Sequence, residues 1–140
     1  MVSYLLDTNV ISELRKSASR AEPAVHAWAE RQATSDLAIS VITLMEIEIG
    51  VEQMERRDPR QGAVLRNWFE DRLLNAFPGQ ILPVDLATVR EAAAMHVPDP
   101  RPERDVLIAA TARSRSLTVV TRNIADFKNL DTVLLNPWDV

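Results

Sequence analysis

The sequence predicts an α/β fold, with a mostly parallel central sheet of roughly four to five short strands flanked by helices. Short apolar runs alternate along the chain with longer segments whose apolar residues recur at helical spacing. This alternation is typical of strands that are buried between two layers of helices. The 140 residues contain no internal repeat, low-complexity segment or linker, so we expect one domain over residues 1–140.

The first half of the chain opens with an apolar run at residues 2–6, which predicts a buried strand leading into a helix around residues 10–14. Pro23 suits the first turn of a second helix, and residues 37–40 form the next expected strand. The helix that follows, over residues 42–54, carries apolar residues on two sides. Such a helix is either buried in the core on both sides or offers one side to a partner.

A break at Asp58-Pro59 separates this helix from an amphipathic helix over residues 61–76, with Val64 on its apolar face. In the second half, the proline-rich segment 98–102 cannot continue a helix and predicts a rigid loop. The remaining expected elements are a strand at 81–82, helices at 86–97 and 106–115, a strand at 117–121, a helical turn at 123–127 and a last strand at 132–135.

The composition excludes several kinds of site. The absence of Cys removes disulfides, thiolate zinc sites and cysteine nucleophiles, and 2 His residues are too few for a His-rich metal site. The net charge of −4 disfavours a general nucleic-acid binder but is compatible with carboxylates gathered around a metal ion. Apolar runs are shorter than the roughly 20 residues of a membrane helix, and no basic segment precedes the first of them. We therefore expect a cytoplasmic protein without a membrane partner.

Four acidic residues lie at or beside the expected junctions between strands and helices. In an open parallel sheet, ligands bind outside the carboxyl ends of the strands, where such junctions gather. If the acids converge there, mutual repulsion protonates some of them unless a cation lies among them. Oxygen ligands of this kind favour Mg²⁺, with Mn²⁺ as an alternative. The four candidate catalytic and metal-binding residues are Asp7, Glu46, Asp105 and Asp126.

Each of these acids also has an ordinary structural explanation. Asp7 could cap the helix that follows it, and Glu46 could close a capping box by accepting the amide of Thr43. Asp105 could offset a helix dipole, and Asp126 could be a solvated turn residue. The strongly apolar surroundings of Asp7 favour a site, because a carboxylate is costly there unless it is paired.

Polar neighbours at the same junctions could assist. Only Arg104 and Arg122 are candidate cationic partners for Asp7. Ser40, at the end of the second expected strand, could either serve the site or cap a turn. Neutral groups that could position a water molecule or a phosphate oxygen are supplied by Thr8, Asn9, Thr121 and Asn123.

Four longer segments contain these residues. They are Leu-Leu-Asp-Thr-Asn-Val-Ile-Ser-Glu from residue 5, Ser-Val-Ile-Thr-Leu-Met-Glu-Ile-Glu-Ile-Gly from residue 40, Asp-Val-Leu-Ile-Ala-Ala-Thr-Ala from residue 105, and Leu-Thr-Val-Val-Thr-Arg-Asn-Ile-Ala-Asp-Phe from residue 117. With a terminal Asn-Pro-Trp, they resemble the PIN-domain ribonuclease toxins, and more narrowly the VapC and FitB-like branch. The resemblance runs from residue 3 to residue 139 in the same order and spacing, and the four segments together are highly specific.

The resemblance implies a PIN-like fold and a Mg²⁺-dependent endoribonuclease that hydrolyses RNA phosphodiester bonds with a metal-activated water. It further implies a toxin of a type II, VapBC-like pair, a homodimer, and a hetero-oligomer with a VapB-like DNA-binding antitoxin that covers the active site. By position, Asp7, Glu46 and Asp105 are the three central metal-site acids. Relatives place the fourth acid at the position of either Asn123 or Asp126, and the neutral side chain of Asn123 leads us to assign the charge to Asp126.

Other functions stay open at this point. An aspartyl phosphatase also begins with a strand followed by Asp-Thr, but such enzymes generally need a second Asp two residues later, where this chain has Asn9. A catalytically silent interaction module would use the acids only to cap helices. A DNA-directed PIN nuclease would share the site and differ in substrate.

Overall fold

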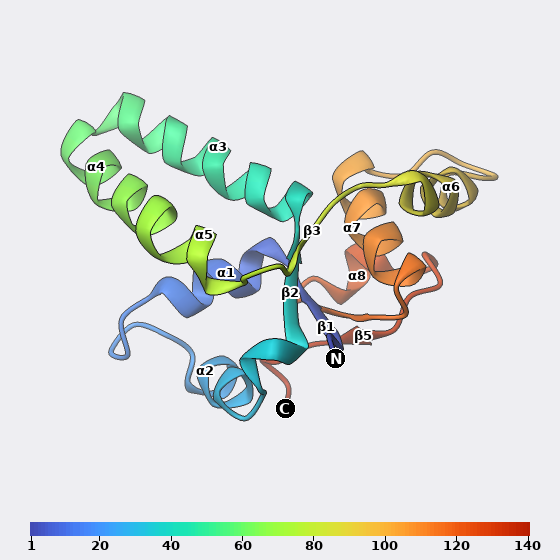
Figure 1. The fold of residues 1–140 in the computed structure, drawn as a ribbon, viewed down its shortest axis with the longest axis horizontal. Helices are drawn as coiled ribbons and strands as arrows, with labels where there is room; N and C mark the ends of the chain where they lie inside the picture. Colours follow the sequence, from blue (N-terminus) through green and yellow to red (C-terminus); the bar gives the residue numbers. More distant parts are fainter.

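The computed structural model describes residues 1–140 and confirms the α/β fold, with a five-stranded sheet in which every pair of neighbouring strands is parallel (Figure 1). The strands are β1 (Tyr4–Leu6), β2 (Leu37–Ser40), β3 (Ile81–Leu82), β4 (Thr118–Val120) and β5 (Leu134–Leu135). The longer helices are α1 (Thr8–Arg15), α2 (Pro23–Glu30), α3 (Val41–Arg57), α4 (Pro59–Trp68), α6 (Leu86–Met95) and α7 (Glu103–Ser114). Short helical segments are η1 (Thr34–Asp36), η2 (Phe69–Leu73), α5 (Leu74–Ala76) and α8 (Ile124–Phe127).

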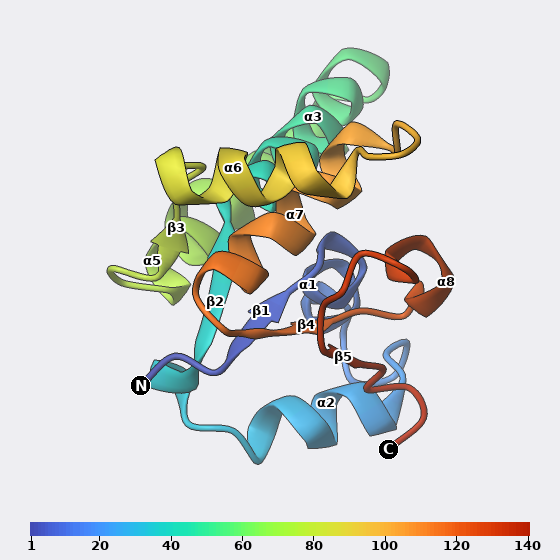
Figure 2. The ribbon, with the colours of Figure 1, turned by 90° about the vertical axis from the view of Figure 1, so that its right-hand side faces the viewer.

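The strand order, β3-β2-β1-β4-β5, places β1 at the centre of the sheet. Successive residues of a strand point to opposite faces, so the apolar central strands contribute side chains to two separate cores. Leu6 belongs to the core beneath the N-terminal helices, whereas its neighbour Leu5 belongs to the core beneath α6 and α7. Figures 1 and 2 show the sheet lying between these two groups of helices, with α6 across the outer side of α7. The layered fold therefore follows from strands that are apolar on both faces.

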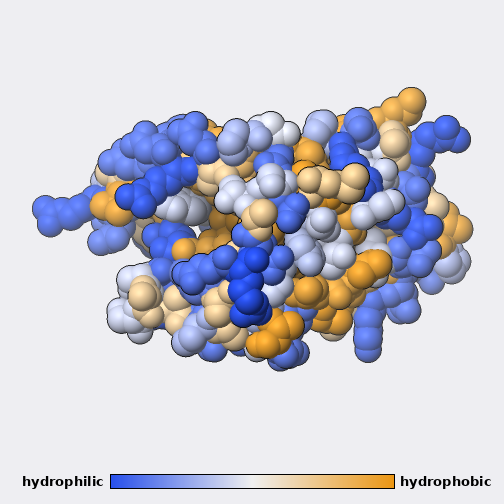
Figure 3. Space-filling model, turned by 60° about the horizontal axis from the view of Figure 1, so that its bottom comes forward, coloured by the Kyte–Doolittle hydropathy of each residue, from blue (hydrophilic) through white to orange (hydrophobic).

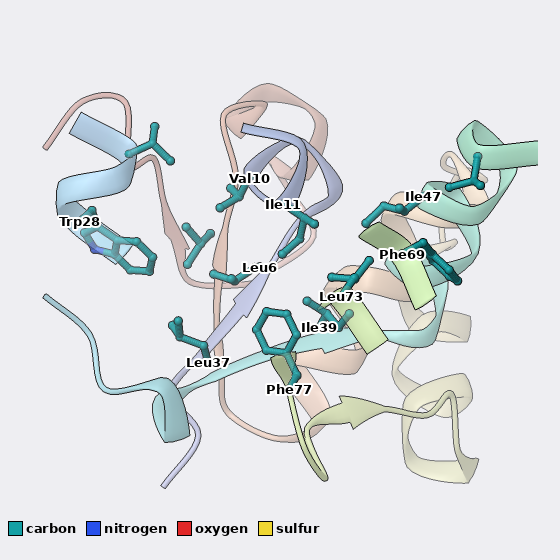
Figure 4. Packing of buried hydrophobic residues seen from close by; sticks show 13 residues of the cluster. Leu6, Val10, Ile11, Trp28, Leu37, Ile39, Ile47, Phe69, Leu73 and Phe77 are labelled. Atoms are coloured by element: carbon teal, nitrogen blue, oxygen red, sulfur yellow. The ribbon is translucent and has the colours of Figure 1, made fainter. Parts of the chain in front are cut away.

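The core on the N-terminal side joins the sheet to helices from several parts of the first half of the chain. Figure 4 shows Leu6 and Ile39 of the sheet facing Ile11 of α1 and Phe69 and Leu73 of η2. These five side chains are buried within one cluster. Because α1 is held against the sheet by this core, the strand-to-helix junction at its N-terminus has a fixed position.

The predicted helix over residues 61–76 is wrong in two respects. The chain forms α4, then the π-helical turn η2, then the three-residue α5, and the wider turn directs both Phe69 and Leu73 into the core. Val64 is 58% exposed rather than core-facing. The reason is that Gly62 faces α3, and Val64 lies about 200° further around the helix.

The α3–α4 pair extends from the sheet as two adjacent antiparallel helices (Figure 1). The guanidinium of Arg66 on α4 binds the carboxylates of Glu48, Glu52 and Glu55 on α3. On the face seen in Figure 3, the surface of this end of the molecule is largely hydrophilic. No helix in the structure is both long enough and apolar enough to cross a bilayer.

The second apolar side of α3 remains uncovered, which is one of the two arrangements that its sequence allows. Met45 is 42% exposed, and it lines a hollow of about 500 Å³ with Val41, Leu44 and Ile49. The opposite side of the same helix is buried through Ile47 and Val51. The helix thus serves the core with one side and leaves an apolar face on the other.

Candidate active site

The carboxyl ends of β1 and β4 bring Asp7 and Thr121 together from opposite ends of the chain. The two strands are parallel with Leu6 beside Val120, so the residues that follow them leave the sheet at the same place. The hydroxyl of Thr121 donates a hydrogen bond to Oδ2 of Asp7 across 2.8 Å. Both side chains are buried, and Asp7 is only 6% exposed. A carboxylate is therefore held inside the protein at the centre of this sheet edge.

Asp7 is surrounded by hydrogen-bond donors and has no cationic partner. Its Oδ1 accepts the backbone N–H of Thr8 across 2.8 Å, which caps α1, and its Oδ2 accepts an N–H of the Asn9 amide across 3.1 Å. The two predicted cationic partners lie elsewhere, since Arg104 pairs with a different acid and Arg122 stacks on Trp138. Burial raises the pKa of Asp7 above its ordinary value in spite of these hydrogen bonds.

The predicted neutral residues on this side of the site form a connected network. Oγ1 of Thr121 accepts N–H groups from the side chain of Asn9, across 3.2 Å, and from the backbone of Asn123, across 3.0 Å. Oδ1 of Asn9 in turn accepts the backbone N–H of Arg122 across 3.0 Å. Through these contacts the α1 and β4 junctions fix each other, and both fix the orientation of Asp7.

Glu46 reaches the same junction from the second turn of α3. Its Oε1 accepts the hydroxyl of Thr8 across 2.6 Å, and its Oε2 lies 3.7 Å from the guanidinium of Arg104. The capping-box interpretation is wrong, because the amide of Thr43 donates instead to Oγ of Ser40, which caps the helix. The carboxylate of Glu46 is thus free to face the site, whereas Ser40 has the capping role.

Asp105 and Asp126 complete the acidic group from the other side of the sheet edge. Asp105 lies in the first turn of α7, and its pKa is raised to about 6, chiefly by burial and then by its acidic neighbours. Neighbouring carboxylates add to this rise because each disfavours a further negative charge. They are, in decreasing order of effect, those of Asp126, Asp7 and Glu46. The four predicted acids therefore interact electrostatically, with Asp126 on the exposed surface of α8.

The chemistry of these side chains fits a hard divalent cation. No three acidic or histidine side chains stand close enough to form a complete ligand set around one ion. Mg²⁺ does not need such a set, since it keeps several water molecules and binds one or two carboxylates directly. The buried carboxylate of Asp7 has no cationic partner, and the pKa of Asp105 is raised by its acidic neighbours. A divalent ion would relieve both effects.

Comparison with known proteins decides the family. The chain matches the PIN domain over residues 4–133. It belongs to the PIN-domain family. Toxin FitB of Neisseria gonorrhoeae is 37% identical over 141 residues, which cover 96% of this chain and 97% of FitB. VapC ribonuclease Y4jK of Sinorhizobium fredii is 35% identical over 142 residues, covering 96% and 97% of the two chains. The predicted VapC and FitB-like branch is confirmed.

Solved structures confirm the PIN fold. The structure of FitAcB from Neisseria gonorrhoeae superimposes with a TM-score of 0.88 at 33% identity, over 98% of this chain and 99% of that one. The FitAB complex bound to an IR36 DNA fragment gives a TM-score of 0.87 at 32% identity, over 98% and 96%. A toxin–antitoxin complex from Klebsiella pneumoniae has a TM-score of 0.66 at 24% identity, which shows the fold alone.

Two contacts of the site were not anticipated from the sequence. Thr43 is fully buried, and its hydroxyl lies 3.5 Å from that of Thr8, next to Glu46. The spacing of three residues between Thr43 and Glu46 on one helix was the available signal. The pairing of Arg104 with Glu46 had no such signal, because it depends on how α7 meets α3.

Proposed function

We propose that this protein is a Mg²⁺-dependent endoribonuclease, with Mn²⁺ as an alternative ion, and the toxin of a VapBC-like toxin–antitoxin pair. The observation that carries the proposal is the buried carboxylate of Asp7, which lacks a cationic partner and lies beside three further acids at the carboxyl edge of a parallel sheet. Relatives that match nearly the whole chain are a toxin and a VapC ribonuclease by name. Both names agree with phosphodiester hydrolysis.

In this proposal Asp7 and Asp105 bind the principal ion, directly or through water. Glu46 helps to hold the ion or orients the attacking water, and Asp126 contributes to a weaker outer position. A bound ion would lower the pKa of a coordinated water molecule and offset charge on the phosphate.

The neutral residues hold these acids in place. Thr121 and Asn9 fix the carboxylate of Asp7 through hydrogen bonds, which leaves its orientation independent of the substrate. The hydroxyl of Thr8 does the same for Glu46. Asn123 would offer its side-chain amide to a water molecule or phosphate oxygen, because that amide forms no hydrogen bond within the protein, whereas its backbone is used.

We further propose a homodimer formed through the exposed apolar side of α3. Met45 and the adjoining hollow leave apolar surface in water, and a second copy of the helix would cover it. A VapB-like DNA-binding antitoxin would join this dimer in a hetero-oligomer. The solved structures of relatives include VapBC bound to promoter DNA and a toxin–antitoxin complex by title.

The proposed activity is tested by incubating purified, antitoxin-free protein with a single-stranded RNA and with DNA of the same sequence. We expect cleavage of the RNA in Mg²⁺ or Mn²⁺, no cleavage after addition of a chelator, and recovery when excess Mg²⁺ is returned. Cleavage of the DNA in place of the RNA would identify a DNA-directed nuclease. Cleavage that persists in the chelator would contradict the metal-dependent mechanism.

A further inference from the structure

A groove of about 290 Å³ leads away from the acidic site between α1, α3 and α4. Thr8 and Glu46 stand at the end that adjoins the acids, so the groove opens directly into the proposed active site. Figure 1 shows α1 beside the α3–α4 pair, whose helices form the other walls. The remaining charged residues of the lining are all cationic, and they are Arg15, Lys16 and Arg20.

Two of these cations have no acidic partner. Lys16 pairs with Glu13 across 3.0 Å, whereas Arg15 and Arg20 are exposed and form no ion pair. The guanidinium of Arg15 lies over the ring of Trp68, 5.7 Å from its centroid, so its planar group is already oriented at the groove wall. An unpaired, oriented guanidinium is well suited to bind a phosphate.

The loop that carries Lys16 and Arg20 is held at the groove by a buried acid. Glu13 is only 6% exposed, and its Oε2 accepts the backbone N–H of Glu22 across 2.9 Å. This hydrogen bond and the charge of Lys16 lower the pKa of Glu13, so the carboxylate stays ionised. Glu13 thus ties both ends of the 16–22 loop to α1. The cations of this loop have a defined place relative to the acids.

The floor of the groove is open because α3 contains Gly50 at this point. A Cβ atom at Gly50 would meet no other atom within 4 Å, so the position would accept a side chain without a clash. Glycine in a helix interior costs about 1 kcal/mol relative to alanine. The open floor therefore has a cost to stability, and it preserves the depth of the groove.

We propose that this groove binds the RNA strand next to the cleaved bond, with Arg15 and Arg20 contacting phosphates that flank the one at the acids. This inference rests on the proposed ribonuclease function. A polyanion bound at a carboxylate site needs cations on either side of the metal, and this groove supplies unpaired ones beside Glu46. A strand lying here also explains how a protein with a net charge of −4 can bind RNA, since the positive charge is concentrated where the substrate lies.

The test compares an R15Q/R20Q double variant with wild type and with R90Q, which removes an exposed, unpaired arginine on α6 outside the groove. Binding of a fluorescein-labelled single-stranded RNA is measured by anisotropy at several salt concentrations, with D7N introduced into all proteins to prevent cleavage. We expect the double variant to bind at least about tenfold more weakly. The slope of the logarithm of the binding constant against the logarithm of the salt concentration should become shallower by roughly 1.4, since each phosphate contact on a single strand contributes about 0.7. R90Q should match wild type.

A second variant tests the groove without altering charge. G50F fills the open floor and should weaken RNA binding much more than G50A, which adds only a methyl group. In the cleavage-competent background, R15Q/R20Q should raise KM and change kcat little. Unchanged RNA binding and cleavage by both R15Q/R20Q and G50F would overturn the inference while leaving the ribonuclease proposal intact. If these variants cleave RNA normally but are no longer inhibited by the antitoxin, the RNA-binding inference is also overturned, and the groove is assigned to the antitoxin.

Discussion

Replacing Asp7 with Asn should abolish RNA cleavage and leave the fold intact. Removing a metal ligand that stabilises the transition state by about 4 kcal/mol should lower kcat/KM about a thousandfold. The thermal stability should change little, because the amide oxygen can still accept the N–H of Thr8, and removal of a buried charge offsets the hydrogen bond that Asn9 donates to Oδ2. The charge of Asp7 does not stabilise the fold, since burial raises its pKa. Initial cleavage rates in Mg²⁺ and melting curves by circular dichroism measure the two effects.

Asp71→Asn is the matched control for this experiment. Asp71 is an exposed acid of η2 that forms no ion pair, so its replacement should affect neither rate nor stability. If D7N cleaves RNA at a rate close to that of wild type, Asp7 is only the cap of α1 and the assignment of the catalytic acids is wrong. A large loss of thermal stability in D7N would instead show that the charge is structural.

Gly62→Ala should destabilise the protein by about 3 kcal/mol, at the upper end of the usual range for overpacking. A Cβ at Gly62 would overlap the Cα of Glu55 and lie 2.7 Å from its backbone N. Backbone atoms of a neighbouring helix cannot rotate away as a flexible side chain can, so α3 and α4 would have to separate. Their separation would also strain the ion pairs of Arg66 with α3.

The same substitution at Gly50 should leave the stability unchanged or raise it. Gly50→Ala adds a methyl group into open space on α3, and alanine is the better helix former by about 1 kcal/mol. Urea denaturation of the two variants and wild type therefore should place G62A below and G50A at or above the wild-type midpoint. Equal midpoints for G62A and wild type would show that α3 and α4 are not as closely packed as described.

Much of the fold follows from local sequence patterns. The five strands are short apolar runs, and their burial on both faces is what predicted a parallel sheet between helices. The strand ends differ from the prediction: residues 2–6 and 117–121 were expected in strands, and the structure has Tyr4–Leu6 and Thr118–Val120. The π-helical turn after Trp68 was missed because it depends on packing of Phe69 and Leu73, and not on their spacing alone.

The candidate site could be predicted from the sequence for a related reason. Asp7 and Thr121 follow strands that prove to be neighbours, and parallel strands bring their carboxyl ends to one edge. The partners of the charged groups could not be predicted from the sequence. The pairing of Arg104 with Glu46 depends on how α7 packs against α3. The positions of Arg15 and Arg20 in the groove depend in the same way on how a loop and three helices pack. Sequence spacing carries no signal for such contacts.

The central claim, that the acids share one divalent ion, is tested most directly by the melting temperature with and without Mg²⁺ across pH, for wild type and Asp105→Asn. The folded-state pKa of Asp105 is raised from 3.8 to about 6, so its contribution to stability is present below the lower value and is lost as pH rises to the higher one. Metal-free wild type should therefore lose stability relative to Asp105→Asn over this window. In wild type Mg²⁺ should restore this stability increasingly over the same window, and it should still stabilise D105N, but less, because Asp7 remains as a ligand. If Mg²⁺ stabilises neither protein at any pH, or stabilises D105N as much as wild type, the acids do not share an ion.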